Sequence, residues 1–238
     1  MPREIEIHAG HWDSPNSGAS GYLNEVKENR RVGKRVHDIL KTYKVPVTYY
    51  EDNVSKNKND NVNHLIAHHN KDTDGLVVSI HFNASAKTSK PMGTEVLYCN
   101  PAMRALASKT SQAISKASGF GLIDRGAKYR DNVGVLVRTK EPAILIEVCF
   151  VDSEVGAAIY TRDFEKICFA IAEVLAEELG YKLQKEVKPV ANTNEPSSWA
   201  KEAWEWAKKK GLVDGTDPKG NLTREQYTVI MYRLEGGK

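Results

Sequence analysis

Short apolar runs alternate with longer amphipathic segments between Ile5 and Gly180, a pattern typical of an α/β domain. The runs predicted to be strands are residues 5–7, 47–50, 76–80, 94–98, 133–137 and 143–148. The runs at 76–80 and 143–148 are apolar on both faces, as the central strands of a parallel sheet are. We therefore predict an α/β fold with a mostly parallel, twisted sheet flanked by helices.

Between the predicted strands, apolar residues recur at the spacing of an amphipathic helix. This spacing predicts helices over residues 32–43, 103–114 and 164–179, and a further helix covers about 61–69. Asp163 is a suitable N-cap for the helix at 164–179, and Gly180 is a suitable stop after it.

The character of the chain changes after the predicted domain of residues 1–181. Residues 182–197 contain two prolines, few apolar side chains and no periodicity, which indicates a linker. Residues 198–238 contain three of the four tryptophans, and we predict that they form a small helical hairpin. A capping box beginning at Thr223 opens its second helix. The residues predicted to share one face of its first helix are Trp199, Ala203, Trp206 and Ala207.

Composition narrows the class of protein. With 238 residues, of which 40% are hydrophobic and 27% charged, the chain can form a substantial core and a small companion module. A net charge of +3 does not favour a nucleic-acid partner, and no apolar run predicts a transmembrane segment. The first residues show no apolar signal region, so we expect synthesis in the cytoplasm without a signal peptide. Cys99, Cys149 and Cys168 lack disulfide or metal-ligand spacing and are expected to be buried as small hydrophobic residues.

Four side chains suited to metal or acid–base chemistry are predicted to meet at one edge of the sheet. His11 and His81 follow the first and third predicted strands, and Glu147 ends the strand at 143–148. The ligand crevice of an open parallel sheet lies at the carboxyl ends of its strands. Glu25, at the start of the first long helix, is the fourth candidate, because the positive end of the helix dipole favours its ionised form.

Two imidazoles and one carboxylate form a three-ligand set that leaves a position for water, as in catalytic zinc sites. A carboxylate outside the set can then move a proton from water to a leaving amine. Spacing alone leaves a purely structural role open for each residue, because the positions form no local motif. His64 and His68 lie one helical turn apart without an evident third ligand, so we interpret them as part of a solvated helix face.

Around these residues the sequence resembles the zinc-dependent N-acetylmuramoyl-L-alanine amidases, over about residues 4–180. The resemblance rests on Ile7-His8-Ala9-Gly10-His11, Leu23-Asn24-Glu25, Ser79-Ile80-His81-Phe82-Asn83 and the segment 142–150. It implies that His11, Glu25 and His81 bind one zinc ion per chain and that Glu147 is the general acid/base. The implied reaction is hydrolysis of the amide between N-acetylmuramic acid and L-alanine of the peptidoglycan stem peptide.

Some positions depart from the pattern of that family. Trp12-Asp13-Ser14-Pro15 stands where a glycine-rich stretch is common, so Trp12 is expected to pack against sugar or peptide. Cys149 replaces a usual glycine in the strand that presents Glu147, and an arginine common before the third strand is not evident. These departures concern how the substrate is held and leave the metal set intact.

The segment 198–238 looks like one S-layer-homology-type repeat, which implies binding to a secondary cell-wall polymer, with self-association into a homo-oligomer as the alternative. The amidase-like segment, the linker and the small module together look like a bacteriophage or prophage endolysin. Such a protein is expected to be made in the bacterial host cytoplasm and to act on the cell wall after release. Two other functions stay open: a zinc peptidase acting on the stem peptide and a non-catalytic cell-wall-binding protein.

Overall fold

The computed structural model describes residues 3–14, 16–183, 196, 200–213 and 224–235. The chain divides into two compact units, residues 1–183 and 184–238. Among the described helices, none combines the length and the apolarity that crossing a membrane requires.

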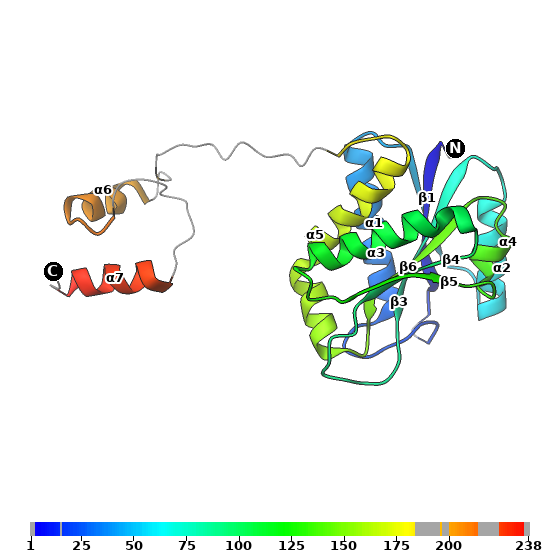
Figure 1. Ribbon diagram of the computed structural model, residues 1–238, viewed down its shortest axis with the longest axis horizontal. Helices are drawn as coiled ribbons and strands as arrows, with labels where there is room; N and C mark the ends of the chain where they lie inside the picture. Colours follow the sequence, from blue (N-terminus) through cyan, green and yellow to red (C-terminus); the bar gives the residue numbers. More distant parts are fainter. Residues whose placement is uncertain (1–2, 15, 184–195, 197–199, 214–223, 236–238) are drawn as a thin grey trace. The chain divides into compact units, whose positions relative to one another are not determined.

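A six-stranded sheet forms the centre of the first unit (Figure 1). Its strands are β1 (Glu4–Trp12), β2 (Val47–Asp52), β3 (Gly75–Asn83), β4 (Thr94–Tyr98), β5 (Asp124–Tyr129) and β6 (Ala143–Phe150). They lie in the order β2-β1-β3-β6-β4-β5, and only the pairing of β4 with β6 is antiparallel within this sheet. The prediction of a mostly parallel sheet is therefore confirmed.

Helices cover both faces of the sheet (Figure 1). The helices of the larger core are α1 (Glu25–Thr42), α3 (Arg104–Ala117) and α5 (Glu154–Glu178), with the short helix η1 (Pro101–Met103) before α3. On the opposite face, α2 (Lys58–His69) and α4 (Gly134–Arg138) pack on a smaller core. Alternate residues of a strand face opposite sides, so Val78 joins the larger core while Val77 joins the smaller one.

The strand predicted at residues 133–137 is wrong, because this segment forms α4. The carbonyl of Val133 accepts hydrogen bonds from the N–H groups of Leu136 and Val137, which closes a helical turn. Val135 and Leu136 are buried in the smaller core, so this apolar run packs against the sheet as a short helix and is not a strand. A five-residue apolar run is too short for periodicity to distinguish the two.

One strand was not predicted. β5 lies at the edge of the sheet and contains the mostly polar sequence DRGAKY. Its residues are exposed or half-buried, so it lacks the apolar pattern of the central strands. Polar edge strands are common because they discourage pairing with other chains.

Helix α5 begins earlier than predicted. Its N-cap is Ser153, whose hydroxyl accepts a hydrogen bond from the N–H of Gly156, whereas Asp163 lies inside the helix at a kink with φ −106° and ψ 17°. Gly180 follows the helix with a φ of 80°, as the predicted stop requires. Cys149 and Cys168 are buried as predicted, but Cys99 is only half-buried.

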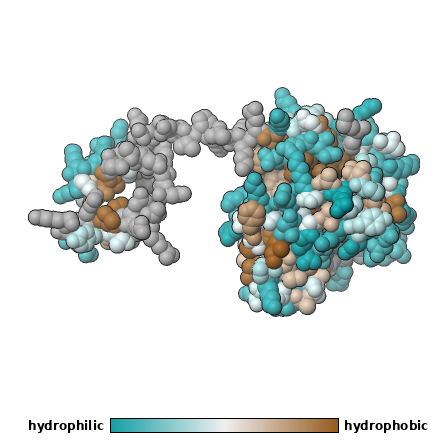
Figure 2. Space-filling view, in the orientation of Figure 1, coloured by the Kyte–Doolittle hydropathy of each residue, from teal (hydrophilic) through white to brown (hydrophobic). Residues whose placement is uncertain are grey.

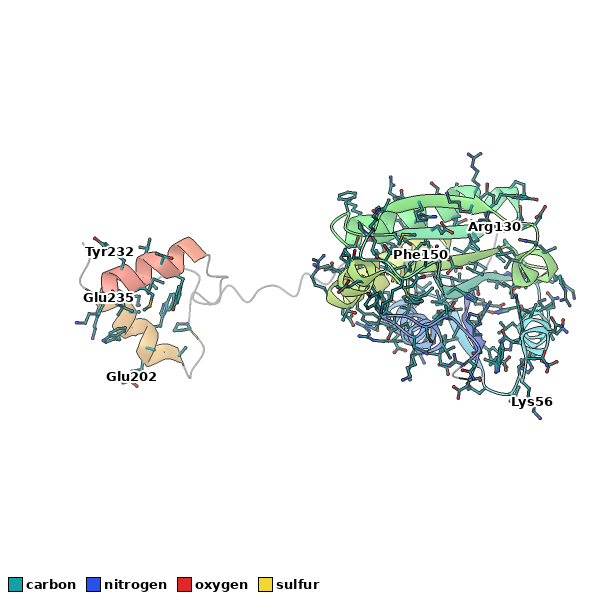
Figure 3. The ribbon with its side chains drawn as sticks, turned by 90° about the horizontal axis from the view of Figure 1, so that it is seen from below. Lys56, Arg130, Phe150, Glu202, Tyr232 and Glu235 are labelled. Carbon is teal, nitrogen blue, oxygen red and sulfur yellow. The ribbon has the colours of Figure 1, made fainter. Side chains whose placement is uncertain are left out.

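The second unit contains the two helices predicted for it, α6 (Lys201–Lys209) and α7 (Arg224–Leu234). Trp199 and Thr223, which belong to the predicted face and capping box, lie outside the described residues. Trp206 of α6 is 50% exposed and Tyr232 of α7 is 59% exposed. Tyr232 is labelled in Figure 3. The visible face of the first unit is largely hydrophilic, with scattered hydrophobic patches (Figure 2).

Candidate metal centre and active site

The structure brings the three predicted metal ligands together. Glu25 Oε1 lies 3.0 Å from His11 Nε2 and 3.0 Å from His81 Nδ1. One ligand atom from each of the three side chains lies within 4.8 Å of the others, so the group can hold a metal ion. The carboxylate is buried, whereas the two imidazoles are partly accessible. A metal held here would therefore stay open to a substrate on the imidazole side.

Three different elements position these ligands. β1 extends beyond its predicted end, and His11 lies in it at a register shift, with a φ of 65° that few residues other than glycine adopt. Glu25 is the first residue of α1, whose N-cap Asn24 accepts a hydrogen bond from the N–H of Lys27. His81 lies near the end of β3, beside Gly10 of β1.

Backbone N–H groups hold the Glu25 carboxylate in place. Ala19 donates to Oε2 at 2.8 Å, and Phe82 donates to Oε1 at 3.2 Å. Burial alone would raise the pKa of Glu25, but hydrogen bonds with His11 and His81 outweigh it and hold the pKa well below its usual range. Glu25 is therefore ionised, which is the state that metal binding requires.

Glu147 lies beside the metal ligands without joining them. Its strand partner on β3 is His81, so the two side chains project from the same face of the sheet. Glu147 Oε2 is buried without a hydrogen-bond partner among the described residues. Burial, with the nearby carboxylates of Glu25 and Glu95, raises the pKa of Glu147 to about 8. A carboxyl group with this pKa can both accept and release a proton near neutral pH.

Sequence reasoning missed a polar group on the other side of Glu147. Glu95 of β4 is the antiparallel partner of Glu147 and is itself buried. Its carboxylate accepts hydrogen bonds from Arg125 at 2.7 Å and from Asn83 at 3.1 Å. Glu95 stands in a fully buried and mostly apolar strand. A glutamate in an apolar run is also what identified Glu147, so Glu95 could have been predicted in the same way.

The interpretation of His64 and His68 as a solvated helix face is wrong in part. Both imidazoles stack on Tyr50 of β2, with ring centroids 5.8 Å and 3.8 Å from it, and both are half-buried. Tyr50 also hydrogen-bonds His64 Nε2 at 2.5 Å. Among the described residues, neither histidine belongs to a group of side chains that could hold a metal ion.

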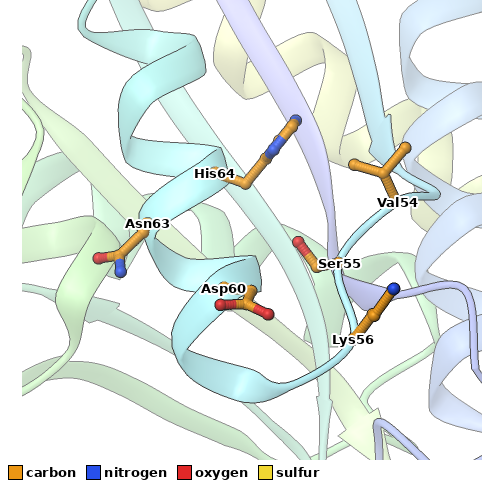
Figure 4. Close-up of a pocket in the computed structure, with 6 residues that line it drawn as sticks. All are labelled: Val54, Ser55, Lys56, Asp60, Asn63 and His64. Carbon is orange, nitrogen blue, oxygen red and sulfur yellow. The ribbon is translucent and has the colours of Figure 1, made fainter.

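A cavity of about 460 Å³ lies next to His64 (Figure 4). Its walls come from α2 and from the loop that follows β2. The lining residues are Val54, Ser55, Lys56, Asp60, Asn63 and His64. None of the four predicted site residues lines it, so we place the candidate active site at the His11, Glu25 and His81 group instead.

Comparisons with known proteins agree with this fold. The structure is similar to the catalytic domain of the CD27L endolysin targeting Clostridia difficile, with a TM-score of 0.64 and 26% identity over 76% of this chain and 99% of that one. The catalytic domain of CwlV, an N-acetylmuramoyl-L-alanine amidase from Bacillus (Paenibacillus) polymyxa var. colistinus, gives a TM-score of 0.61 and 29% identity over 75% and 99% of the two chains.

Curated relatives extend the similarity along the chain. The endolysin of Bacillus phage SPP1 is 27% identical over 93% of this chain and 80% of its own length. The chain spans little more than half of two uncharacterised Clostridium perfringens relatives, 57% and 54% of their lengths. A family model described as N-acetylmuramoyl-L-alanine amidase matches residues 5–193. Because that match covers most of the sequence, the chain belongs to the N-acetylmuramoyl-L-alanine amidase family.

Proposed function

We propose that this chain is a peptidoglycan hydrolase that cleaves the amide between N-acetylmuramic acid and L-alanine of the stem peptide. The observation that carries the proposal is the convergence of His11, Glu25 and His81 within 4.8 Å, with Glu147 on the neighbouring strand. The family match supports the choice of bond. Peptidoglycan is therefore the proposed partner of the first unit.

The proposed cofactor is one zinc ion held by His11, Glu25 and His81. The donor set fits this metal, because zinc favours imidazole nitrogens and carboxylate oxygens and catalytic sites keep three protein ligands. His81 suits the role because burial lowers its pKa, so that the imidazole is neutral and can coordinate. When bound, zinc would polarise the substrate carbonyl and lower the pKa of a bound water.

In the proposed mechanism, Glu147 moves the proton. Its carboxylate accepts a proton from the water whose oxygen adds to the amide carbonyl carbon, and then donates that proton to the amide nitrogen. The C–N bond breaks as the nitrogen gains the proton. The products are a carboxyl group on the lactyl side and a free amino group on L-alanine. We also propose that Trp12, which is half-buried beside His11, packs against sugar or peptide.

Digestion of purified peptidoglycan tests the bond and the metal together. We expect mass spectrometry to find free L-alanine amino termini and intact muramic acid, with product formation abolished by chelator and restored by Zn²⁺. Peptide fragments cut inside the stem would instead identify a peptidase. Retention on walls without any cleavage would identify a binding protein.

The raised pKa of Glu147 predicts a pH-dependent stability for the metal-free protein. The folded pKa is about 8 and the ordinary value is 4.5, so between these values the folded state holds a proton that the unfolded state has released. The stabilisation is complete below about pH 4.5 and is lost as pH rises through 8. Each unit of pKa difference corresponds to about 1.4 kcal/mol. We expect the free energy of unfolding, measured by urea denaturation, to fall more steeply between pH 5 and 8 for the natural chain than for Glu147→Gln. Equal slopes of this free energy against pH would contradict the assignment.

We further propose that the chain acts as a phage or prophage endolysin that reaches the wall from the host cytoplasm after release. The similarity to the SPP1 endolysin supports this. Residues 198–238 would then bind a secondary cell-wall polymer through exposed aromatic residues such as Trp206. The full chain carrying Trp204→Ala and Trp206→Ala is expected to lose wall retention in a pull-down. Unchanged retention with a changed oligomeric state would favour self-association of this module.

A further inference from the structure

A second cluster of ligand-type side chains lies inside the first unit. Glu6 on β1, His69 at the end of α2 and Glu141 just before β6 are all buried, and one ligand atom from each lies within 4.8 Å of the others. Gly75, which contacts this cluster, lies at the start of β3, six residues before His81. Six residues of strand span about 20 Å, so the cluster is separate from the candidate metal centre.

The two carboxylates of the cluster converge on Gly75. Glu141 Oε1 accepts a hydrogen bond from the N–H of Gly75 at 2.7 Å, and a Cβ at this glycine would lie only 2.4 Å from Glu6 Oε1. Glu6 and Glu141 are more than nine-tenths buried, with 6% and 5% of each residue exposed. Glu6 Oε1 and Glu141 Oε2 nevertheless have no hydrogen-bond partner among the described residues. Buried carboxylate oxygens left unpaired are costly, which points to a positively charged ligand between them.

The histidine of the cluster is arranged as a metal ligand is. His69 Nδ1 lies 2.5 Å from Glu6 Oε2, while His69 Nε2 lies 2.8 Å from Nδ1 of the buried His8. Metal-binding histidines commonly use one ring nitrogen for the metal and the other for such a hydrogen bond.

Two further carboxylates connect the cluster to solvent. Asp72 is exposed, Asp74 is half-buried, and together with Glu141 they form a second group of ligand atoms within 4.8 Å. Burial, together with the charge of Asp72, raises the pKa of Glu6 to about 7. A cation could therefore enter past Asp72 and Asp74, and it would relieve the repulsion among these carboxylates.

We propose that Glu6, His69 and Glu141 bind a second divalent cation of the first transition row, such as Zn²⁺ or Mn²⁺. Mixed imidazole and carboxylate ligands suit these ions. The cation would join the start of β1, the end of α2 and the segment before β6, at the opposite end of the strands from the candidate active site. The cation would bind the folded chain and not the unfolded one, so it would stabilise the fold. Its role would therefore be structural.

Metal content of the full chain tests the proposal. The protein is stripped with chelator, reloaded with Zn²⁺ or Mn²⁺, passed through a desalting column and measured by elemental mass spectrometry. We expect two equivalents in the natural chain, one in His11→Ala/His81→Ala, and none when Glu141→Gln is added to that pair. In the His11→Ala/His81→Ala background, added metal should also raise the unfolding temperature, and Glu141→Gln should abolish this rise.

The control is His64→Gln/His68→Gln in the same background, which removes the two histidines stacked on Tyr50 and should keep one equivalent. No metal in His11→Ala/His81→Ala would overturn the proposal, as would one equivalent that survives Glu141→Gln or that disappears with the control pair. If Glu141→Gln does not fold, Glu6→Gln and Gly75→Ala address the same ligands from β1 and β3. These measurements do not depend on amidase activity, so the proposal can fail while the proposed function stands.

Discussion

Glu147→Ala should abolish most of the hydrolytic activity while leaving the metal content unchanged. Glu147 lies beside His81 across two paired strands but is not one of the three ligands, so its removal takes away proton transfer and not metal binding. A positioned acid/base contributes about 10²- to 10⁴-fold to a rate, and we expect kcat to fall by about this factor. The measurement is release of L-alanine amino termini from purified walls, with bound zinc determined on the same sample.

The matched control for this variant is Glu178→Ala, which removes an exposed glutamate near the end of α5. It should keep full activity. Glu147→Gln adds a second comparison, because it preserves the shape of the side chain and removes its ability to accept a proton. If Glu147→Gln retained near-natural turnover, the proton would have to be moved by another group, and the proposed mechanism would be wrong.

Gly10→Ala should weaken metal binding by about 10- to 100-fold, the usual effect of disturbing the support of a metal ligand. A Cβ at this position would lie 2.2 Å from His81 Nε2 and 2.3 Å from Cε1. Both distances are shorter than a van der Waals contact, so the imidazole ring would have to move. The ring cannot retreat without leaving Glu25 Oε1, which lies 3.0 Å from Nδ1. Activity should fall in proportion and recover at high zinc concentration. Zinc affinity from competition with a chromogenic chelator measures the effect.

Gly121→Ala makes the same chemical change where it should be tolerated. Its Cβ would meet the tip of the flexible Ile159 side chain at 2.9 Å, and that side chain can rotate away. We expect natural zinc affinity for this variant. If the Gly10→Ala protein bound zinc as tightly as the Gly121→Ala protein, a Cβ at position 10 would not displace the His81 ring, and this prediction would be wrong.

The meeting of His11 and His81 could be predicted from the sequence because one rule governs it, whereas Glu25 was selected by its place at the start of a helix. Parallel strands bring their carboxyl ends to one edge of the sheet, and the strands at 76–80 and 143–148 are recognisable because they are apolar on both faces. The distances themselves could not be predicted. They depend on the register shift in β1 and on the positive φ of His11, neither of which leaves a pattern in the sequence.

Other features were hidden for different reasons. β5 is polar because it lies at an edge, and α4 is too short to show a helical period. The Asp163 kink lies within a continuous helix, so a side chain that resembles an N-cap marks a bend instead. Glu6 and His69 are 63 residues apart in the chain, and only the packing of α2 against β1 brings them into contact.

The reversed direction of β4 has a consequence for how this fold can be changed. Because β4 runs antiparallel to β6, the connection from Asn83 to Thr94 begins and ends at the edge that holds the candidate active site. Residues inserted there would extend over the substrate side and would add nothing to the cores on the two faces. This connection is therefore the natural place to graft a longer loop when a different peptide is to be admitted, and the fold should tolerate it better than an insertion at the opposite ends of the strands.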